Sequence, residues 1–180
     1  MTRAPEEPAA PLVDFAGLFN AHAQHLRRFA VYLSGDAALA DDLVSEAFVR
    51  MWTARDRLEL PTVRSYLFAI VRNLFLHHVR QQKRRDPLPE DAIDARPGPE
   101  DRASDRSELR VVLAALAGLS EIDRAALLMR ADEGTSYEEI AAALGISVTA
   151  AKVKVHRARL KLAEARLAAP ASARARENTP

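Results

Sequence analysis

The chain has 180 residues, of which 48% are apolar, and it carries 26 basic and 25 acidic residues, ten prolines and no cysteine. This apolar fraction can bury a core, and the length fits one domain or two small ones, so a wholly disordered chain is excluded. The lack of cysteine excludes disulfide scaffolds, cysteine-ligated zinc and thiol catalysis, and it indicates a reducing compartment, which we take to be the cytoplasm.

Prolines divide the chain into segments in which helices can run. They cluster in residues 1–11, which we expect to be disordered and which lack the apolar stretch of a secretory signal. Another cluster lies in residues 86–106. Nine of the ten aromatic residues lie before this second cluster. We therefore predict two small domains with different cores, over residues 12–85 and 107–166.

Helical periodicity dominates both domains, and no convincing run alternates strictly as a strand would, so the predicted fold class is all-α. In the first domain we expect helices over residues 12–33 and 37–55 and a third that opens at Pro61-Thr62. Ser34-Gly35 is a stop signal, and a new helix starts at Asp36. The third helix ends in a block, Arg72 to Arg85, that holds five basic residues and no acidic one.

The second proline cluster predicts a flexible, extended linker over residues 86–106. Residues 86–108 hold eight acidic and three basic residues, whereas residues 152–166 hold six basic residues and one acidic one. The net charge of +1 is therefore the cancellation of two basic blocks against an acidic block between them. A plain solvated spacer remains the alternative for the linker.

In the second domain we expect helices over residues 107–117, 120–131 and 137–144 and a longer one after Ser147, followed by a disordered tail over 167–180. Ser136 and Glu139 form a capping-box pattern, and Gly145 can take the positive φ that a tight turn needs. The last two helices thus have the pattern of a helix-turn-helix.

The helix after Ser147 is apolar on one side and basic on the other. Its predicted buried stripe is Val148, Ala151, Val155, Ala158 and Leu162. The remaining surface holds Thr149, Lys152, Lys154, His156, Arg157 and Arg159. Such a helix suits docking on a core and entry into a DNA major groove. An ordinary solvated surface helix is the alternative.

Three segments of the chain together resemble the extracytoplasmic-function (ECF) family of bacterial RNA polymerase sigma factors. Ser136–Ser147 with Lys152 and His156–Arg159 resembles region four of that family. Ala40–Trp52 is similar to its region-two helix, and Tyr66–Asn73 with Arg80 to its promoter-reading helix.

The resemblance implies a dissociable initiation subunit made of two small helical domains. Region two would bind the clamp of the largest subunit of core polymerase and read the minus-ten promoter element. Region four would bind the flap of the second-largest subunit and read the minus-thirty-five element. It also suggests an anti-sigma factor as a partner. Membrane insertion is not expected, because the longest apolar stretch, roughly Val111 to Leu119, is about half of what a bilayer needs.

The resemblance places candidate site residues by position. The polymerase-binding candidates are Asp42, Ser45, Glu46 and Arg50. The minus-ten candidates are Arg64, Arg72, Asn73, Arg80, Lys83 and Arg84, with residues 55–62 as the loop that captures an unstacked base and Arg85 as a further cation. The minus-thirty-five candidates are Ser147, Thr149, Lys152, Lys154 and Arg157. Phe48 and Trp52 are expected in the core.

Other classes remain open at this stage. A stand-alone helix-turn-helix regulator would explain residues 107–166 but not the first domain, and a helical adaptor would show no salt-dependent DNA affinity. An enzyme is not expected, because no phosphate loop or serine elbow is present. His77 and His78 are adjacent, with no acid beside them, so neither a metal site nor a cofactor is predicted.

Overall fold

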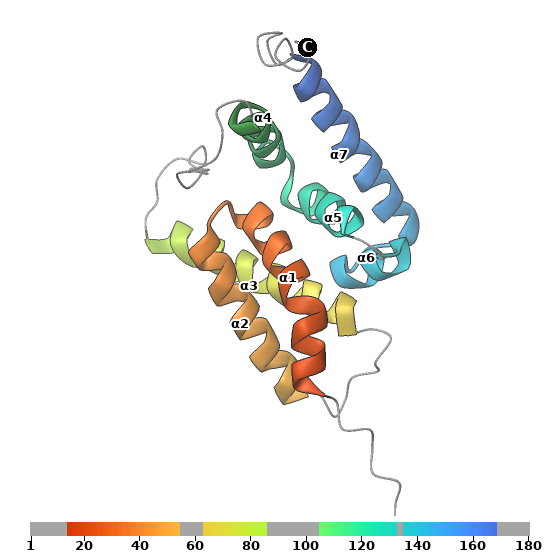
Figure 1. Ribbon diagram of the computed structural model, residues 1–180. Helices are drawn as coiled ribbons and strands as arrows, with labels where there is room; N and C mark the ends of the chain where they lie inside the picture. Colours follow the sequence, from red (N-terminus) through yellow and green to blue (C-terminus); the bar gives the residue numbers. More distant parts are fainter. Residues whose placement is uncertain (1–13, 55–62, 86–104, 133–134, 169–180) are drawn as a thin grey trace, which may run out of the picture.

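The computed structural model describes residues 14–54, 63–85, 105–132 and 135–168, and every regular element in these ranges is an α-helix (Figure 1). The helices are α1 (Phe15–Ser34), α2 (Ala37–Ala54), α3 (Val63–Arg85), α4 (Asp105–Ala117), α5 (Glu121–Ala131), α6 (Tyr137–Leu144) and α7 (Val148–Ala168). The all-α prediction is confirmed. None of the described helices has the combination of length and apolarity that crossing a lipid bilayer would require.

Local chemistry sets the boundary between α1 and α2 where the sequence predicts it. Gly35 has φ 76°, and its amide donates to the Val31 carbonyl at 2.8 Å, which ends α1. The Asp36 carboxylate then accepts from the amides of Ala38 at 2.8 Å and Leu39 at 3.0 Å. This side chain caps the start of α2, so the turn contains one residue with a left-handed backbone and one N-cap.

The first three helices pack side by side around an aromatic and aliphatic interior. Phe29 of α1 meets Phe68 of α3 edge to face, with ring centroids 5.0 Å apart. Phe48 of α2 is 2% exposed, as predicted. Trp52 is 37% exposed, so its predicted place in the core is wrong. It lies one turn further along α2, where the helix passes the edge of the interior, and its ring packs on Phe15 at 5.1 Å.

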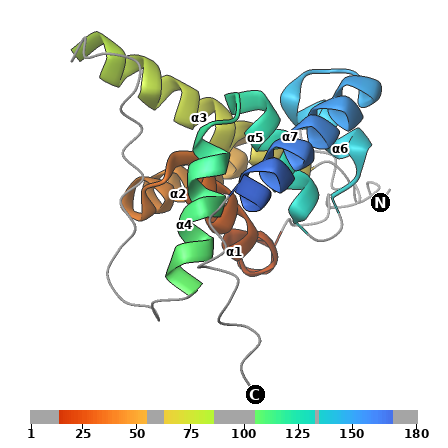
Figure 2. The same cartoon turned by 90° about the horizontal axis from the view of Figure 1, so that it is seen from above.

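In the second half, α5 and α6 lie against α7, and α4 covers the later part of α7. A small cluster of Leu116, Leu119, Leu127 and Ala158 joins the ends of α4 and α5 to α7. Figure 2 shows α4 and α7 side by side when seen from above. The predicted disordered tail, residues 167–180, starts too early, because α7 continues to Ala168.

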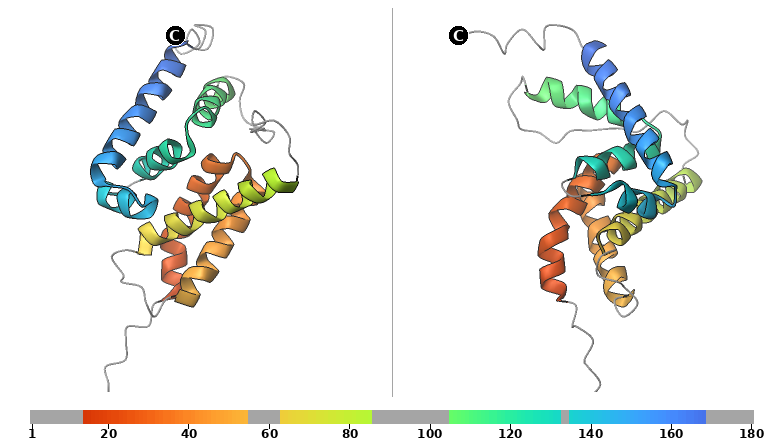
Figure 3. Two further views of the ribbon diagram at one scale, coloured as in Figure 1. Left: turned by 180° about the vertical axis from the view of Figure 1, so that it is seen from behind. Right: turned by 90° about the vertical axis from the view of Figure 1, so that its right-hand side faces the viewer.

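The two halves are in contact. Helix α5 packs on α1, and α6 packs on α3, as the two views of Figure 3 also indicate. One continuous buried cluster therefore includes Leu26 and Val71 of the first half and Met129 and Ile140 of the second. We predicted different cores from the distribution of aromatic residues. The aliphatic faces of α5 and α6 are nevertheless stabilised by removal from water, and they are buried against α1 and α3.

Several expectations concern segments outside the described residues. These are the disordered N-terminus at 1–11, the base-capturing loop at 55–62, and the tail beyond 168. The linker at 86–106 is outside them as well, apart from its last two residues, which lie in α4.

Candidate nucleic-acid interface

The turn between α6 and α7 fixes the position of α7. The Ser136 amide donates to Glu139 Oε2 at 2.7 Å, and the Glu139 amide donates to Ser136 Oγ at 3.1 Å, which completes the predicted capping box. Gly145 has φ 66°, and the Ile146 amide donates to the Ala141 carbonyl at 3.0 Å. Ser147 Oγ accepts from the Ala150 amide at 3.1 Å and starts α7. The predicted helix-turn-helix is therefore present.

The buried side of α7 is the one that the periodicity predicts. Ala151, Val155 and Ala158 are at most 1% exposed, and Val148 and Leu162 are partly buried at either end of this stripe. These side chains meet α5, α6 and α4. Because the stripe is held on three helices, the opposite side of α7 has a fixed direction toward solvent.

The outward side of α7 carries most of the predicted minus-thirty-five residues. Ser147, Thr149, Lys152 and Arg157 are all exposed. The Lys152 ammonium also lies 5.7 Å from the centre of the Tyr137 ring, which holds this side chain near the start of α7. This cationic, outward surface at the N-terminal half of the second helix suits a DNA groove.

Lys154 lies elsewhere. Its ammonium is 3.2 Å from Asp123 Oδ1 on α5, and its side chain is 26% exposed. Burial alone would raise the pKa of Asp123, but hydrogen bonds from Ser120 and Lys154 and the charges of Lys154 and Lys161 outweigh it and lower this pKa. The structure therefore gives Lys154 a partner inside its own half rather than a place on the outward surface.

Val153 is a residue that sequence reasoning did not single out. It is 44% exposed and lies between Thr149 and Arg157 on successive turns of α7. An exposed apolar side chain in the middle of a basic surface can contact the methyl group of thymine. The sequence does signal the exposure of Val153, because this residue lies two positions from both Ala151 and Val155 and therefore on the side of the helix opposite the buried stripe. His156 shares this outward surface.

Two of the predicted minus-ten arginines lie in the interface between the halves. Arg72 of α3 binds Glu121 of α5 through two hydrogen bonds, Nε to Oε1 at 2.7 Å and Nη2 to Oε2 at 2.8 Å. Arg64 of α3 pairs with Asp132 at the other end of α5. The two arginine side chains are 15% and 22% exposed, respectively.

Asp132 is the centre of a cluster that α1 completes. His25 Nδ1 lies 2.5 Å from Asp132 Oδ1, and Arg28 Nη2 lies 3.4 Å from the same oxygen. Burial alone would raise the pKa of Asp132, but the hydrogen bonds and charges of His25 and Arg64 outweigh it and hold this pKa below its usual value. The carboxylate is thus ionised at neutral pH and 8% exposed.

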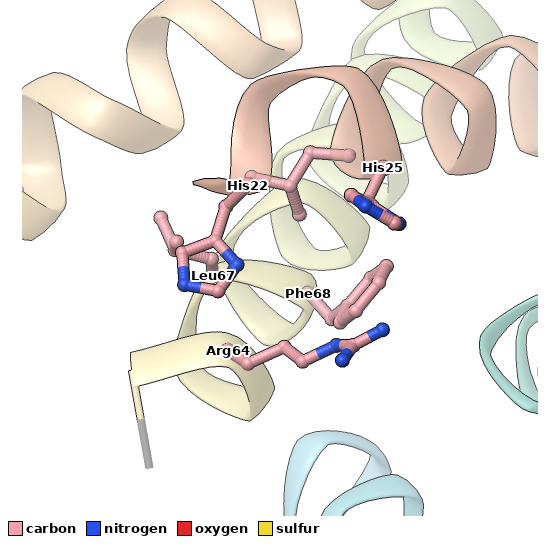
Figure 4. A pocket seen from close by; sticks show the side chains of 6 residues that line it. His22, His25, Arg64, Leu67 and Phe68 are labelled. Atoms are coloured by element: carbon pink, nitrogen blue, oxygen red, sulfur yellow. The ribbon is translucent and has the colours of Figure 1, made fainter. Parts of the chain in front are cut away.

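Next to this cluster, His22 faces the same arginine from α1. Figure 4 shows His22 and His25 of α1 with Arg64, Leu67 and Phe68 of α3 around one pocket. Burial, and then the charges of Arg64 and His25, lower the pKa of His22, while Asp132 opposes them. The structure therefore favours the neutral form of His22.

The remaining predicted minus-ten residues are on the surface. Asn73, Arg80, Lys83 and Arg84 are exposed along α3, and Arg85 ends that helix. Figure 2 shows the C-terminal end of α3 reaching beyond the other helices. The structure thus separates the predicted set into two groups. Asn73, near the middle of α3, and Arg80, Lys83 and Arg84, toward its C-terminal end, are exposed, whereas Arg64 and Arg72 are paired with Asp132 and Glu121.

The predicted polymerase-binding residues share the outward side of α2. Asp42, Ser45, Glu46 and Arg50 are exposed, and Arg50 Nε donates to Glu46 Oε1 at 2.8 Å. Val49, which lies among them, is 60% exposed. Figure 1 shows α2 on the side of the first half that lies away from α7. Contact between the two halves therefore leaves this surface open.

Comparison with known proteins accounts for both halves. The family model for sigma-70 region 2 matches residues 18–85, and that for sigma-70 region 4 matches residues 109–162. ECF RNA polymerase sigma factor EcfG of Rhodopseudomonas palustris is 37% identical over 76% of this chain and 76% of its own length. RNA polymerase sigma factor CarQ of Myxococcus xanthus is 35% identical over 83% of this chain and 87% of its own.

The chain belongs to the ECF family of RNA polymerase sigma factors. A third relative, ECF RNA polymerase sigma factor SigE of Mycolicibacterium smegmatis, is 36% identical over 85% of this chain, which spans 62% of the SigE length. The region 2 match explains the first half, which a stand-alone helix-turn-helix regulator would leave unexplained.

Two solved structures are similar in fold to this chain. The sigma factor RpoE in complex with the anti-sigma factor NepR from Bartonella quintana has a TM-score of 0.72 and 28% identity, over 87% of this chain and 99% of that one. CnrH in complex with the cytosolic domain of CnrY has a TM-score of 0.59 and 28% identity, over 83% and 85%. In this sigma factor, the ranges that the two family models match assign α1–α3 to region two and α4–α7 to region four.

Proposed function

We propose that this sigma factor binds the core of bacterial RNA polymerase in the cytoplasm and directs it to start transcription at promoters with defined minus-ten and minus-thirty-five elements. It would act by binding and not as an enzyme. The observation that carries the proposal is the outward, basic surface of a helix-turn-helix in a chain that also contains region two.

Region two would supply two surfaces. The polar side of α2, with Asp42, Ser45, Glu46 and Arg50, is exposed and would contact the clamp of the largest subunit. Along α3, the candidates for the minus-ten element are Arg64, Arg72, Asn73, Arg80, Lys83 and Arg84. Cationic side chains along one helix can follow a single-stranded backbone while a loop captures a base.

Region four would read the minus-thirty-five element with α7 and contact the flap of the second-largest subunit. Ser147 lies at the N-terminus of α7, where backbone amides favour a phosphate. Thr149, Lys152 and Arg157 face outward, where they can contact base edges or phosphates. We extend this surface to Val153 and give Lys154 a mainly structural role, because Lys154 is paired with Asp123.

An anti-sigma factor is a further proposed partner. The solved relative RpoE is bound to the anti-sigma factor NepR, and the chain covers 99% of that relative. A protein that covers the outward side of α2 would prevent assembly with polymerase.

Mapping of transcript 5′ ends after controlled overexpression tests the proposal. We expect new start sites that share one motif near position −35 and another near −10, at a spacing that both regions can reach at once. Changed abundance only at start sites that were already in use would instead favour a stand-alone regulator and contradict the proposal. Asp42→Ala with Glu46→Ala should abolish the new sites, whereas Glu164→Gln, on the exposed later part of α7, should keep them.

A further inference from the structure

Among residues 148–158, which the structure describes in full, Val153 is the one exposed apolar side chain of α7. The other exposed residues of this stretch are Thr149, Lys152, His156 and Arg157, all of which carry hydrogen-bonding or charged groups. Val153 is 44% exposed and offers only methyl groups. The surface that would face DNA in the proposed function therefore has an apolar point among polar and cationic neighbours.

The direction of the Val153 side chain is set by the rest of region four. Ala151 and Val155 are at most 1% exposed, and Val153 lies two positions from each, so it points away from the helices that bury them. A valine in a helix has one strongly preferred χ1 rotamer, because it is branched at Cβ. It therefore loses less conformational freedom than a lysine or an arginine would when a partner covers it.

A DNA major groove offers such a side chain one apolar partner. The base edges in this groove present hydrogen-bond donors and acceptors, apart from the methyl group at C5 of thymine. A valine placed on a donor or an acceptor would remove that group from water without a replacement hydrogen bond, which is unfavourable. A valine placed on a C5-methyl group buries apolar surface of both partners, which is favourable. Val153 therefore favours one chemical group of the groove over the others.

The basic neighbours of Val153 would fix its place in the groove. Lys152 directly precedes it, and Arg157 follows one turn later on the same side of α7. Neither of these two residues has an acidic partner within the part of the chain that the structure describes. Contacts with phosphates set the register of a protein on a duplex. With both cations available for phosphates, Val153 would meet the same base pair each time the chain binds.

We propose that Val153 makes recognition of the minus-thirty-five element depend on the C5-methyl group of one pyrimidine, so that 5-methylcytosine can provide the contact that thymine provides. This inference rests on the proposed function, which places α7 at that element. Methylation of cytosine at C5 adds the same apolar group at the same edge of the groove, and it leaves base pairing unchanged. The chain would thus respond to a chemical modification of promoter DNA.

The test measures promoter binding by the full-length chain assembled with purified core RNA polymerase. The probe is a fluorescein-labelled duplex of the promoter recovered by transcript mapping, and fluorescence anisotropy at one fixed salt concentration gives the affinity. Each thymidine of the minus-thirty-five element is replaced in turn by deoxyuridine, which lacks only the methyl group. Each deoxycytidine is replaced in turn by its 5-methyl derivative, and both strands are scanned.

Val153→Ala is the test variant, and Leu160→Ala is the matched control. Alanine favours a helix more than valine does, so the first change should leave α7 folded. Leu160 is also apolar and is 50% exposed. It lies seven positions later on the same side of α7, about 10 Å further along the helix axis. Thermal melts check that both variants fold.

We expect one position at which loss of the thymine methyl group weakens binding by the parent chain about fourfold, the ratio that corresponds to burial of one methyl-sized group. Val153→Ala should bring this ratio close to one, whereas Leu160→Ala should keep it. A second pair of probes has a C·G pair at this position. The probe with 5-methylcytosine there should bind the parent chain about fourfold more tightly than the probe with cytosine.

Two results would overturn the proposal. One is a methyl dependence of the same size in the parent chain and in Val153→Ala, which would assign the methyl contact to another residue. The other is a full scan in which no methyl group changes the affinity of the parent chain. Failure of the proposed function would appear separately, as the absence of new start sites in transcript mapping.

Discussion

Replacement of Arg157 by Ala should weaken binding of the minus-thirty-five element without loss of stability. Replacement of Lys154 by Ala should instead lower stability and leave DNA affinity nearly unchanged. Arg157 is exposed on α7 and has no ion-pair partner among the described residues. Lys154, three positions earlier, lies against Asp123 with both side chains largely buried. Both are basic residues of one helix, so the comparison isolates the direction in which each side chain points.

The expected magnitudes differ in kind. Loss of an arginine that contacts a base edge costs about 1–3 kcal/mol of binding free energy, which is roughly a 5-fold to 150-fold loss of affinity. Removal of exposed Arg157 should change the free energy of unfolding by less than about 0.5 kcal/mol. For Lys154→Ala we expect a loss of about 1 kcal/mol of stability, because a partly buried Asp123 loses its partner, and less than about a threefold change in DNA affinity.

The assay is fluorescence anisotropy with a duplex that carries the minus-thirty-five motif recovered by transcript mapping, together with urea unfolding of each variant. Arg159→Ala, at another exposed position of α7, serves as a control for loss of one positive charge. Equal losses of affinity for Lys154→Ala and Arg157→Ala, at unchanged stability, would refute the reasoning, since α7 would then meet DNA with a different side.

Two further predictions concern stability. Gly145→Ala should lower the free energy of unfolding by about 1 kcal/mol, because φ is 66° and no atom lies within 4 Å of the added methyl group, so the cost is that of the backbone alone; urea unfolding checks this, and an unchanged midpoint would contradict it. The pKa of His22 is lowered in the folded chain, so below about pH 6.5 the unfolded chain binds more protons than the folded chain does. The free energy of unfolding should therefore decrease as the pH falls from about 6.5 through the folded pKa of His22. His22→Gln should reduce this slope between about pH 7 and pH 5, and a slope of the opposite sign in the parent chain would contradict the assignment.

The helix-turn-helix was predictable because its signals are local. Ser136, Glu139 and Gly145 act on backbone groups within a few residues of themselves, and the structure has them in these roles. The same holds for Gly35 and Asp36 between α1 and α2. Such signals need no knowledge of the rest of the fold.

The partners of basic residues were not predictable, because they come from distant parts of the chain. Lys154 lies three residues after Ala151 and directly before Val155 on α7. It therefore stands at the border between the buried stripe and the outward side of the helix. Whether a residue at this border points to solvent or to α5 depends on Asp123, 31 positions earlier. Likewise, the basic block of α3 did not reveal that Arg72 meets Glu121, since their pairing depends on how the two halves dock.

The docking itself depends on faces that look alike in the sequence. Met129 and Ile140 each lie at helical spacing from other apolar residues of their own helix. This spacing predicts that they are buried, but it does not predict which surface buries them. The structure places them in one cluster with residues of α1–α3. The aromatic residues gave the wrong expectation of separate cores because aliphatic contacts join the halves.

Run-off transcription with purified core RNA polymerase is the most direct test of the central claim. Its templates are the promoters recovered by transcript mapping, and the reaction is run with and without the full-length chain. We predict a transcript of defined length that appears only when the chain is added and that is lost when either promoter element is scrambled. No transcript at any of these promoters, or equal product without the chain, would contradict the account.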